Sequence, residues 1–287
     1  MTLSLSSQDL LILARKPISA CVICFNEEDN IKRCLESLKW VNDSGGEIIV
    51  VDSFSTDRTV EICQQFTNKV FQNRWLGYVN QKNYALSLAS NEWVLSLDAD
   101  EMISSKARDE IIQEWKDNGF EKYDGYYFKR HTFYLGRWIN HGGWYPDYKL
   151  RLFRKSKGKW GGDDPHDRVI IQKPAIIKKF QGEILHYTYK NISHHLKKID
   201  NFSDYAMKSL LSKNKRYNFF NLFLRPHVKF LEIYLWKLGF LDGMPGLIIA
   251  VLSSYYIFIR YAKLWEFKKV KKKIEHDSAQ FSFKEKQ

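Results

Sequence analysis

Three carboxylates directly follow the apolar run "WVLSL": Asp98, Asp100 and Glu101. A buried charge without a partner is costly, so positive charge must lie beside them. In an extended chain Asp98 and Asp100 point the same way and offer two hard oxygen ligands to one point in space. Mg2+ or Mn2+ takes one or two protein carboxylates when phosphate and water supply the other ligands. The spacing therefore indicates a divalent cation that carries a diphosphate, and helix capping is the structural alternative.

Acidic residues also end two other apolar runs. Asp52 closes "EIIVVD", where a carboxylate can accept hydrogen bonds from a base N–H group or a ribose hydroxyl. Glu27 follows "ISACVICFN" and either bonds to a nucleotide or complements the dipole of the next helix. Asp57 is better explained as the cap of a turn, and Ser55 or Thr56 as the cap of the following helix.

The order of the apolar runs predicts how these residues are positioned. From Pro17 to about Asn118, runs such as "ISACVICF" alternate with amphipathic segments such as "NEEDNIKRCLESLKW", where Asn26 is a plausible helix N-cap. Such repeats predict an α/β fold with a doubly wound parallel sheet and right-handed crossovers. Ligands bind such sheets beyond the carboxyl ends of the strands, where "FNEE", "DSFSTD" and "DADE" place their acids.

From Tyr123 to Tyr189 the pattern predicts strands without intervening helices, which form an antiparallel extension of the sheet. The predicted strands are "GYYFKRHTFYL", "YKLRLFR", "RVII", "AIIKKF" and "ILHYTY", with "HGGWYPD" and "WGGDDPHD" as glycine-rich loops. Arg151 and Arg154 could donate two hydrogen bonds each to a phosphate. Because they are three residues apart they face opposite ways on a regular strand, and Arg151 is the one expected to point into the site.

After Asn191 the chain is predicted to be helical. The apolar stretch 244–259 is about 16 residues long, short of the roughly 20 that span a bilayer. The aromatic residues and the "KKVKKK" run that flank it favour an in-plane anchor on an anionic membrane surface. The alternative is a helical hairpin that packs on the sheet or on a second subunit.

Composition narrows the function classes. The formal net charge of +12 suits phosphate-rich partners, but no nucleic-acid-binding module accompanies it. Neither G-x-G-x-x-G nor G-x-x-x-x-G-K-[ST] occurs, which argues against a dinucleotide oxidoreductase and a P-loop NTPase. "FNEEDN" has no glycine, unlike the usual loop of a sugar-1-phosphate nucleotidylyltransferase. The N-terminal segment is a poor secretory signal, and the four cysteines lie in apolar segments, as in a reduced cytosolic protein.

Four motifs together resemble the family 2 glycosyltransferases of the GT-A fold, which is Rossmann-like. They are "ISACVICFNEEDNIKRCLESL", "EIIVVDSFSTDRTVEI", "YVNQKNYAL" and "VLSLDADE", and the resemblance covers roughly residues 18–190. The later "GGWYPDYKLRLFRK", "WGGDDPHDRV" and "ILHYTY" look like the lipopolysaccharide core β-1,4-glucosyltransferase subgroup, as does the C-terminal "GFLDGMPGLIIAVLSSYYIFIRYAKLWE".

The resemblance implies roles for individual residues. Phe25, Glu27 and Asp52 would line the uridine pocket, and Lys82 of "QKN" would face the base or the diphosphate. Asp98 would lie near the ribose and the metal ion, with Asp100 as the principal ligand of Mg2+ or Mn2+.

Transfer with inversion also needs a group that accepts the proton of the acceptor hydroxyl. Related sequences have a histidine–acid pair where this chain has "PHD", which favours Asp167, with Asp164 as the second candidate. His166 either accepts the proton or orients the acceptor or a phosphate. Arg151 would assist the leaving diphosphate.

The implied function is the transfer of a hexose, glucose in that subgroup, from a UDP-sugar to a lipopolysaccharide inner-core heptose or a similar glycolipid. Residues 17–118 would bind the nucleotide sugar, residues 119–190 would complete the same GT-A domain with the acceptor and catalytic half, and residues 191–287 would associate with the membrane. We expect a cytoplasmic protein at the cytoplasmic face of the inner membrane, with no nucleic-acid partner. The alternatives are a non-catalytic sugar-nucleotide or glycolipid-binding protein and a transferase for another envelope polysaccharide.

Overall fold

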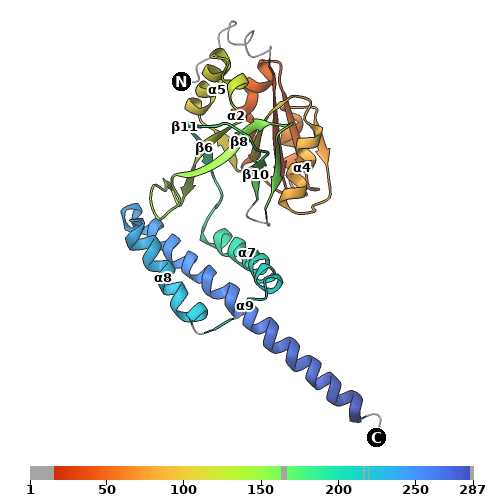
Figure 1. Cartoon of the computed structure of the whole chain (residues 1–287), viewed down its shortest axis with the longest axis vertical. Helices are drawn as coiled ribbons and strands as arrows, with labels where there is room; N and C mark the ends of the chain where they lie inside the picture. Colours follow the sequence, from red (N-terminus) through yellow and green to blue (C-terminus); the bar gives the residue numbers. More distant parts are fainter. Residues whose placement is uncertain (1–15, 163–166, 216, 219, 285–287) are drawn as a thin grey trace. The chain divides into compact units, whose positions relative to one another are not determined.

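The computed structural model describes residues 16–162, 167–215, 217–218 and 220–284, with side chains described up to Val270 (Figure 1). The chain forms two compact units. The first, here called the sheet unit, spans Met1–Trp138 and Trp144–Thr188. The second, the helical unit, spans Ile139–Gly143 and Tyr189–Gln287.

The first half of the sheet unit is a parallel sheet in which the strands run in the order β3-β2-β1-β4. These strands are β1 (Ile18–Cys24), β2 (Glu47–Asp52), β3 (Val70–Gln72) and β4 (Trp93–Asp98), and the helices between them are α2 (Ile31–Asp43), α3 (Thr59–Gln64) and α4 (Tyr78–Leu88). Every residue of β1 and β2 is buried, as expected for strands that are covered on both faces.

Helices cover both faces of this sheet: α2 and α5 (Ser105–Lys116) lie on one side and α4 on the other (Figure 1). Alternate residues of β1 enter two separate cores. Ala20 and Val22 pack in the core beneath α2 and α5, whereas Cys21 and Ile23 pack in the core beneath α4. All four cysteines of the chain are buried and unpaired, as the sequence indicated.

The second half extends the sheet through mainly antiparallel pairs, in the order β4-β8-β6-β11-β5, although β6 and β11 are parallel. The further elements are β5 (Glu101–Ile103), α6 (Gly119–Lys122), β6 (Gly125–Tyr134), β7 (Arg137–Trp138), β8 (Asp147–Arg154), β9 (Gly158–Gly161), β10 (Arg168–Ile171) and β11 (Ile177–His186). The predicted fold class is thereby confirmed. The two strands predicted within residues 175–189 are one strand, β11, whose register shifts between Lys179 and Glu183.

The prediction of Asn26 as a helix N-cap is wrong. Helix α2 begins at Ile31, with Asn30 at the N-cap position. Asn26 has a φ of 51°, and its side-chain oxygen accepts a hydrogen bond from the Thr56 N–H group at 2.8 Å. A left-handed residue at the end of β1 delays the helix by one turn, and its amide joins the loop after β1 to the loop after β2.

The helical unit contains α7 (Ile192–Ser212), α8 (Arg225–Leu231) and α9 (Gly243–Lys284), with short π- and 3-10-helical turns at Phe220–Leu224, Glu232–Trp236 and Gly239–Asp242. Its small core includes Ile257, Tyr261 and Leu264 of α9, packed against side chains that include Met207 of α7. The 32-residue segment Gly239–Val270 is long and apolar enough to cross a membrane by length and composition alone. The expectation that the apolar stretch is too short for a crossing therefore does not hold.

Candidate functional site

Asp52 ends β2 and is fully buried. One carboxylate oxygen accepts a hydrogen bond from the Ser55 N–H group at 2.9 Å, and the other accepts one from the Ser55 hydroxyl. The Cys24 thiol lies 3.6 Å from the same carboxylate. The side chain therefore stabilises the turn after β2, and both of its oxygens are engaged there.

The loop after β1 holds the other residues predicted for the uridine pocket. Phe25 is 54% exposed. Glu27 accepts a hydrogen bond from the Asn30 side chain at 2.8 Å. Asp57 accepts hydrogen bonds from the backbone of Thr59 at 3.0 Å and of Glu28, which is the capping arrangement that the sequence favoured.

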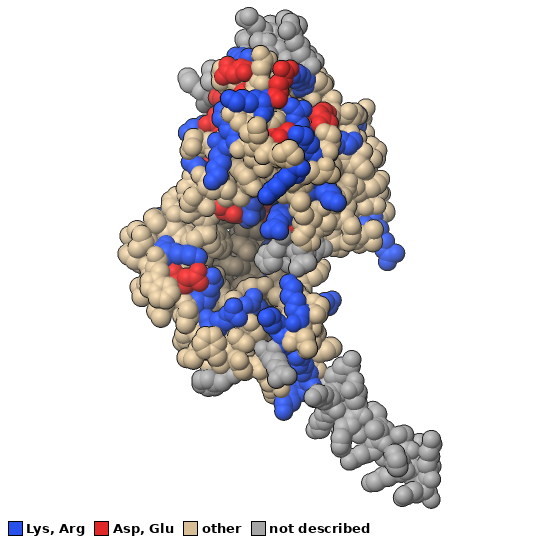
Figure 2. Space-filling view, in the orientation of Figure 1, with Lys and Arg blue, Asp and Glu red and all other residues tan. Residues whose placement is uncertain are grey.

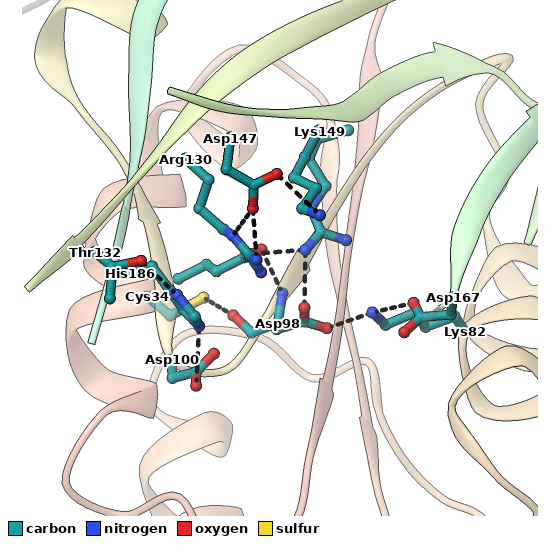
Figure 3. Close-up of polar contacts among 12 residues, drawn as sticks. Cys34, Lys82, Asp98, Asp100, Arg130, Thr132, Asp147, Lys149, Asp167 and His186 are labelled. Carbon is teal, nitrogen blue, oxygen red and sulfur yellow. Dashed lines mark hydrogen bonds and ion pairs between the residues drawn. The ribbon is translucent and has the colours of Figure 1, made fainter. Parts of the chain in front are cut away.

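Eight charged side chains meet at the carboxyl end of β4, and we call them the charge cluster (Figure 3). The members are Lys82, Asp98, Glu101, Arg130, Asp147, Lys149, Arg151 and Asp167. They come from α4, β4, β5, β6, β8 and the segment just before β10, so the cluster depends on the pairing of both halves of the sheet. Four are basic and four acidic, which makes the cluster neutral as a set.

Lys82 joins the strand-end acid to the predicted base. Its Nζ atom lies 2.7 Å from an Asp98 oxygen and 2.7 Å from an Asp167 oxygen. Only 3% of the Lys82 side chain and 10% of that of Asp167 are exposed. The Lys82 ammonium also lies 4.3 Å from the centre of the Trp160 ring, a cation–π distance.

Arg151 holds the other side of Asp98. Its Nη2 atom lies 2.8 Å from Asp98 and 2.7 Å from the buried Glu101, which also accepts a hydrogen bond from the Asp98 N–H group. Burial alone would raise the pKa of Asp98, but the charges of Lys82 and Arg151 outweigh burial and hold this pKa well below its usual range. Arg154 points elsewhere, toward the backbone oxygens of Phe120 and Tyr123.

The outer part of the charge cluster is a chain of ion pairs. Arg130 lies 2.7 Å from Asp147 and 3.5 Å from Glu101, and Lys149 lies 3.1 Å from Asp147. Burial, followed by the nearby Arg130 charge, lowers the pKa of Lys149. Side chains at alternate positions of β8, namely Asp147, Lys149 and Arg151, thus lead from the partly exposed strand start to the buried acids.

Asp100 takes a different partner from Asp98 (Figure 3). Its carboxylate lies 3.4 Å from Nε2 of His186, whose Nδ1 lies 3.2 Å from the Thr132 hydroxyl. The pairing of β11 with β6 and β5 sets this geometry, because His186 is in register with both Thr132 and Glu101.

Asp98 and Asp100 offer the carboxylate oxygens that a hard divalent cation prefers, and His186 adds an imidazole nitrogen beside Asp100. Among the described residues, no group of three or more His, Cys, Asp or Glu side chains is arranged to hold a metal ion. Asp98 is held by two cations, whereas Asp100 and His186 form a carboxylate–imidazole pair. Two protein donors fit a cation that takes its remaining ligands from phosphate and water.

The structure brings Lys82, Asp98, Arg151 and Asp167 together but leaves Phe25 and Glu27 in the loop after β1 and Asp52 at the end of β2. Asp164 and His166, the other predicted catalytic residues, lie outside the described residues. No sequence motif predicts a role for the cluster members Glu101, Arg130, Asp147 and Lys149. For Asp147 and Lys149 on β8, the charged residues at alternate positions of "DYKLR" are the sequence feature that could have predicted them.

Comparison with known proteins matches residues 19–176, more than half of the chain, to the family described as glycosyl transferase family 2. An uncharacterised glycosyltransferase of Rickettsia typhi is 30% identical over 258 residues, which cover 88% of this chain and 87% of the relative. The lipopolysaccharide core biosynthesis glycosyltransferase LpsC of Rhizobium meliloti is 27% identical over 88% of this chain and 95% of its own length. Among solved structures, glucosyl-3-phosphoglycerate synthase from Mycobacterium tuberculosis with Mg2+ and UDP has a TM-score of 0.37 and 20% identity over 45% of this chain and 48% of that chain.

Proposed function

Because the chain belongs to glycosyl transferase family 2, we propose that it moves a hexose, glucose in the first instance, from a UDP-sugar to a lipopolysaccharide inner-core heptose or a similar glycolipid. The acceptor class is suggested by LpsC, the relative whose name refers to lipopolysaccharide core biosynthesis.

One observation carries the proposal: a buried lysine lies 2.7 Å from both the carboxylate that ends β4 and a second carboxylate, Asp167, just before β10. Lys82 and Arg151 supply positive charge for a diphosphate, and Asp167 supplies a base close to it. Donor binding and proton removal are thereby supported within one group of contacting side chains.

The reaction that fits these groups is a direct displacement. The acceptor hydroxyl oxygen forms a bond to the anomeric carbon of the sugar while the bond from that carbon to the diphosphate oxygen breaks. Asp167 takes the hydroxyl proton, and the electron pair leaves on UDP. Lys82 and Arg151 stabilise the charge that develops on the diphosphate.

Asp100 and His186, with Asp98 beside them, would hold Mg2+ or Mn2+. When bound, the cation neutralises diphosphate charge and so assists the leaving group. A dication would balance the two charges of the diphosphate, which suits a charge cluster that is already neutral. Asp100→Asn is therefore expected to weaken the response to added Mn2+.

The helical unit supports an association with an anionic membrane surface. Its surface in Figure 2 shows Lys and Arg beside wide areas without charge and with few acidic side chains. Around its 3-10 turn, Trp236 is 70% exposed, Leu241 50% and Met244 65%. Exposed aromatic and aliphatic side chains flanked by lysines suit the headgroup region of a bilayer.

We place α9 along the membrane surface and not across it. Lys263 of α9 lies 2.7 Å from both Asp200 and Asp204 of α7, and Arg225 donates a hydrogen bond to the Tyr261 hydroxyl at 2.7 Å. A crossing helix would take these charged groups into hydrocarbon, which is costly. The protein is accordingly proposed to be cytoplasmic and peripheral to the inner membrane.

The donor is tested with the full-length protein and UDP-glucose, UDP-galactose, UDP-N-acetylglucosamine and GDP-mannose, each with and without Mn2+. Release of UDP from one UDP-sugar, increased by a core glycolipid acceptor, is expected. No release of UDP from any of them, with or without acceptor, would show that the proposed function is wrong.

Asp167→Asn tests the base. Loss of general-base catalysis is expected to lower kcat by about 10²- to 10⁴-fold without weakening the binding of UDP. Asp124→Asn is the matched control, because Asp124 also pairs with a lysine, Lys157 at 2.8 Å, but lies outside the charge cluster. An equal loss in kcat in the two variants would show that Asp167 is not the base.

A further inference from the structure

The ammonium group of Lys82 lies against three protein groups. Its Nζ atom lies 2.7 Å from Asp98, 2.7 Å from Asp167 and 4.3 Å from the centre of the Trp160 ring (Figure 3 shows the two carboxylates). Of these contacts, the one to Asp167 is a hydrogen bond, whereas Asp98 is an ion-pair partner and the ring a cation–π partner. An incoming anion therefore competes with these groups for Lys82.

The two carboxylates are not equally able to give up Lys82. Asp98 has a second cation within ion-pair distance, because Arg151 lies 2.8 Å away. For Asp167, Lys82 is the cation that the described residues provide at such a distance. If Lys82 leaves Asp98, that carboxylate remains paired, whereas if Lys82 leaves Asp167, a carboxylate whose side chain is 10% exposed becomes available to accept a proton.

We propose that Lys82 is a positioning residue that couples donor binding to the release of the base. The diphosphate of the donor displaces Asp167 from Lys82, and the freed carboxylate then accepts the proton of the acceptor hydroxyl. This inference rests on the proposed function. It adds an order to the reaction: while the donor is absent, Asp167 stays in its ion pair with Lys82, so the base is available only after the donor has bound.

The displacement leaves Lys82 with an anionic partner. Both phosphates of the donor are negatively charged, so a phosphate oxygen can replace the Asp167 carboxylate beside Lys82. The ion pair between Lys82 and Asp167 must break when the donor binds, so its strength is subtracted from the binding of UDP. Removal of the Asp167 charge should therefore strengthen UDP binding, the opposite of what is expected for a residue that binds the nucleotide.

Titration calorimetry of the full-length protein with UDP and Mg2+ tests this coupling. Asp167→Asn is expected to bind UDP roughly five- to tenfold more tightly than the unmodified protein, since about 1 kcal/mol corresponds to a fivefold change. Lys82→Met is expected to bind UDP more weakly. In the double variant, Asp167→Asn should bring no gain over Lys82→Met alone, because the competition for Lys82 no longer exists.

Two results would overturn the inference while leaving the proposed function in place. One is UDP affinity that is unchanged or weaker in Asp167→Asn. The other is a gain from Asp167→Asn that persists in the Lys82→Met background, which would reflect the general removal of negative charge near a bound anion. Asp124→Asn should leave UDP affinity unchanged, and thermal unfolding checks that each variant is folded. If neither the unmodified protein nor any variant binds UDP, the proposed function fails first, and this inference fails with it.

Discussion

The two units of this protein differ in their balance of basic and acidic residues. The sheet unit has 26 Lys and Arg residues against 25 Asp and Glu residues, whereas the helical unit has 19 against 8. The helical unit therefore carries a net charge of +11 out of the +12 of the whole chain. The strongly basic composition is a property of residues 189–287 and not of the unit that holds the charge cluster.

The two units also differ in what they bury and expose. The sheet unit buries charged side chains such as Lys82, Glu101 and Arg151, each matched by opposite charge. Of the 27 large hydrophobic residues that are exposed in the described part of the chain, 20 belong to the helical unit. Buried paired charge and exposed apolar surface are both unusual in a soluble domain, and they support the chemistry proposed for the sheet unit and the membrane association proposed for the helical unit.

The largest expected effect concerns the buried charge of the sheet unit. Arg151→Met leaves Asp98 with one cation and takes from Glu101 its closest cation, which should lower the free energy of unfolding by about 3–5 kcal/mol in urea. Arg154→Met, on the same strand, removes hydrogen bonds to backbone oxygens and should cost about 1–2 kcal/mol. Equal losses in the free energy of unfolding would mean that the ion pairs of Arg151 contribute no more to stability than the backbone hydrogen bonds of Arg154.

An intermediate effect is expected from the exposed apolar surface of the helical unit. Simultaneous replacement of Trp236, Phe240 and Leu241 by serine should weaken sedimentation with anionic phospholipid vesicles at least tenfold, since burial of one such side chain contributes about 1.5–3 kcal/mol. Because the three residues are 70%, 43% and 50% exposed, stability should change little.

The matched control for the membrane surface replaces exposed apolar residues of the sheet unit. Leu76 and Ile176 are 62% and 58% exposed, so the double serine variant removes apolar surface of the same kind. Vesicle binding should be unaffected by this control. If the control loses as much binding as the helical-unit variant, the membrane surface is not confined to the helical unit.

The smallest effect separates the units by pH. Burial, with help from the Lys198 charge, lowers the pKa of His195 in α7 to about 4. The unfolded chain then binds more protons than the folded chain between about pH 6.5 and 4, so stability is complete above this window and falls through it by about 2 kcal/mol after allowance for partial hydration. In the sheet unit the pKa of Asp98 is lowered, so its contribution is present above about pH 4 and is lost below that value.

Two optical signals can follow the two pH windows. Seven of the nine tryptophans lie in the sheet unit, so tryptophan fluorescence reports mainly on that unit. Far-ultraviolet circular dichroism is dominated by helix, and the longest helices, α7 and α9, belong to the helical unit. Acidification should change the dichroism first and the fluorescence later, and His195→Gln should remove the earlier change. Coincident changes at all pH values would contradict the separation.

The sequence alone determined the parallel half of the sheet. Fully apolar runs alternate with amphipathic helices there, and both signals are local, since each depends on residues within one or two turns or strands. It also determined that acids gather at the carboxyl ends of strands, because parallel strands end at one edge. The positions of Asp98 and Asp100 follow from this.

The partners of these acids were decided by tertiary structure. Arg151, Arg130 and Asp167 come from 53, 32 and 69 residues after Asp98 in the chain, on strands or beside a strand whose order β4-β8-β6-β11-β5 no local pattern specifies. Tertiary structure also gives Asp98 and Asp100 different partners. Lys82 and Arg151 lie beside Asp98, whereas the pairing of β11 with β5 and β6 brings His186 to Asp100. Burial of charge is favourable only where opposite charges from distant segments meet, and which segments meet is fixed by the packing of the whole sheet.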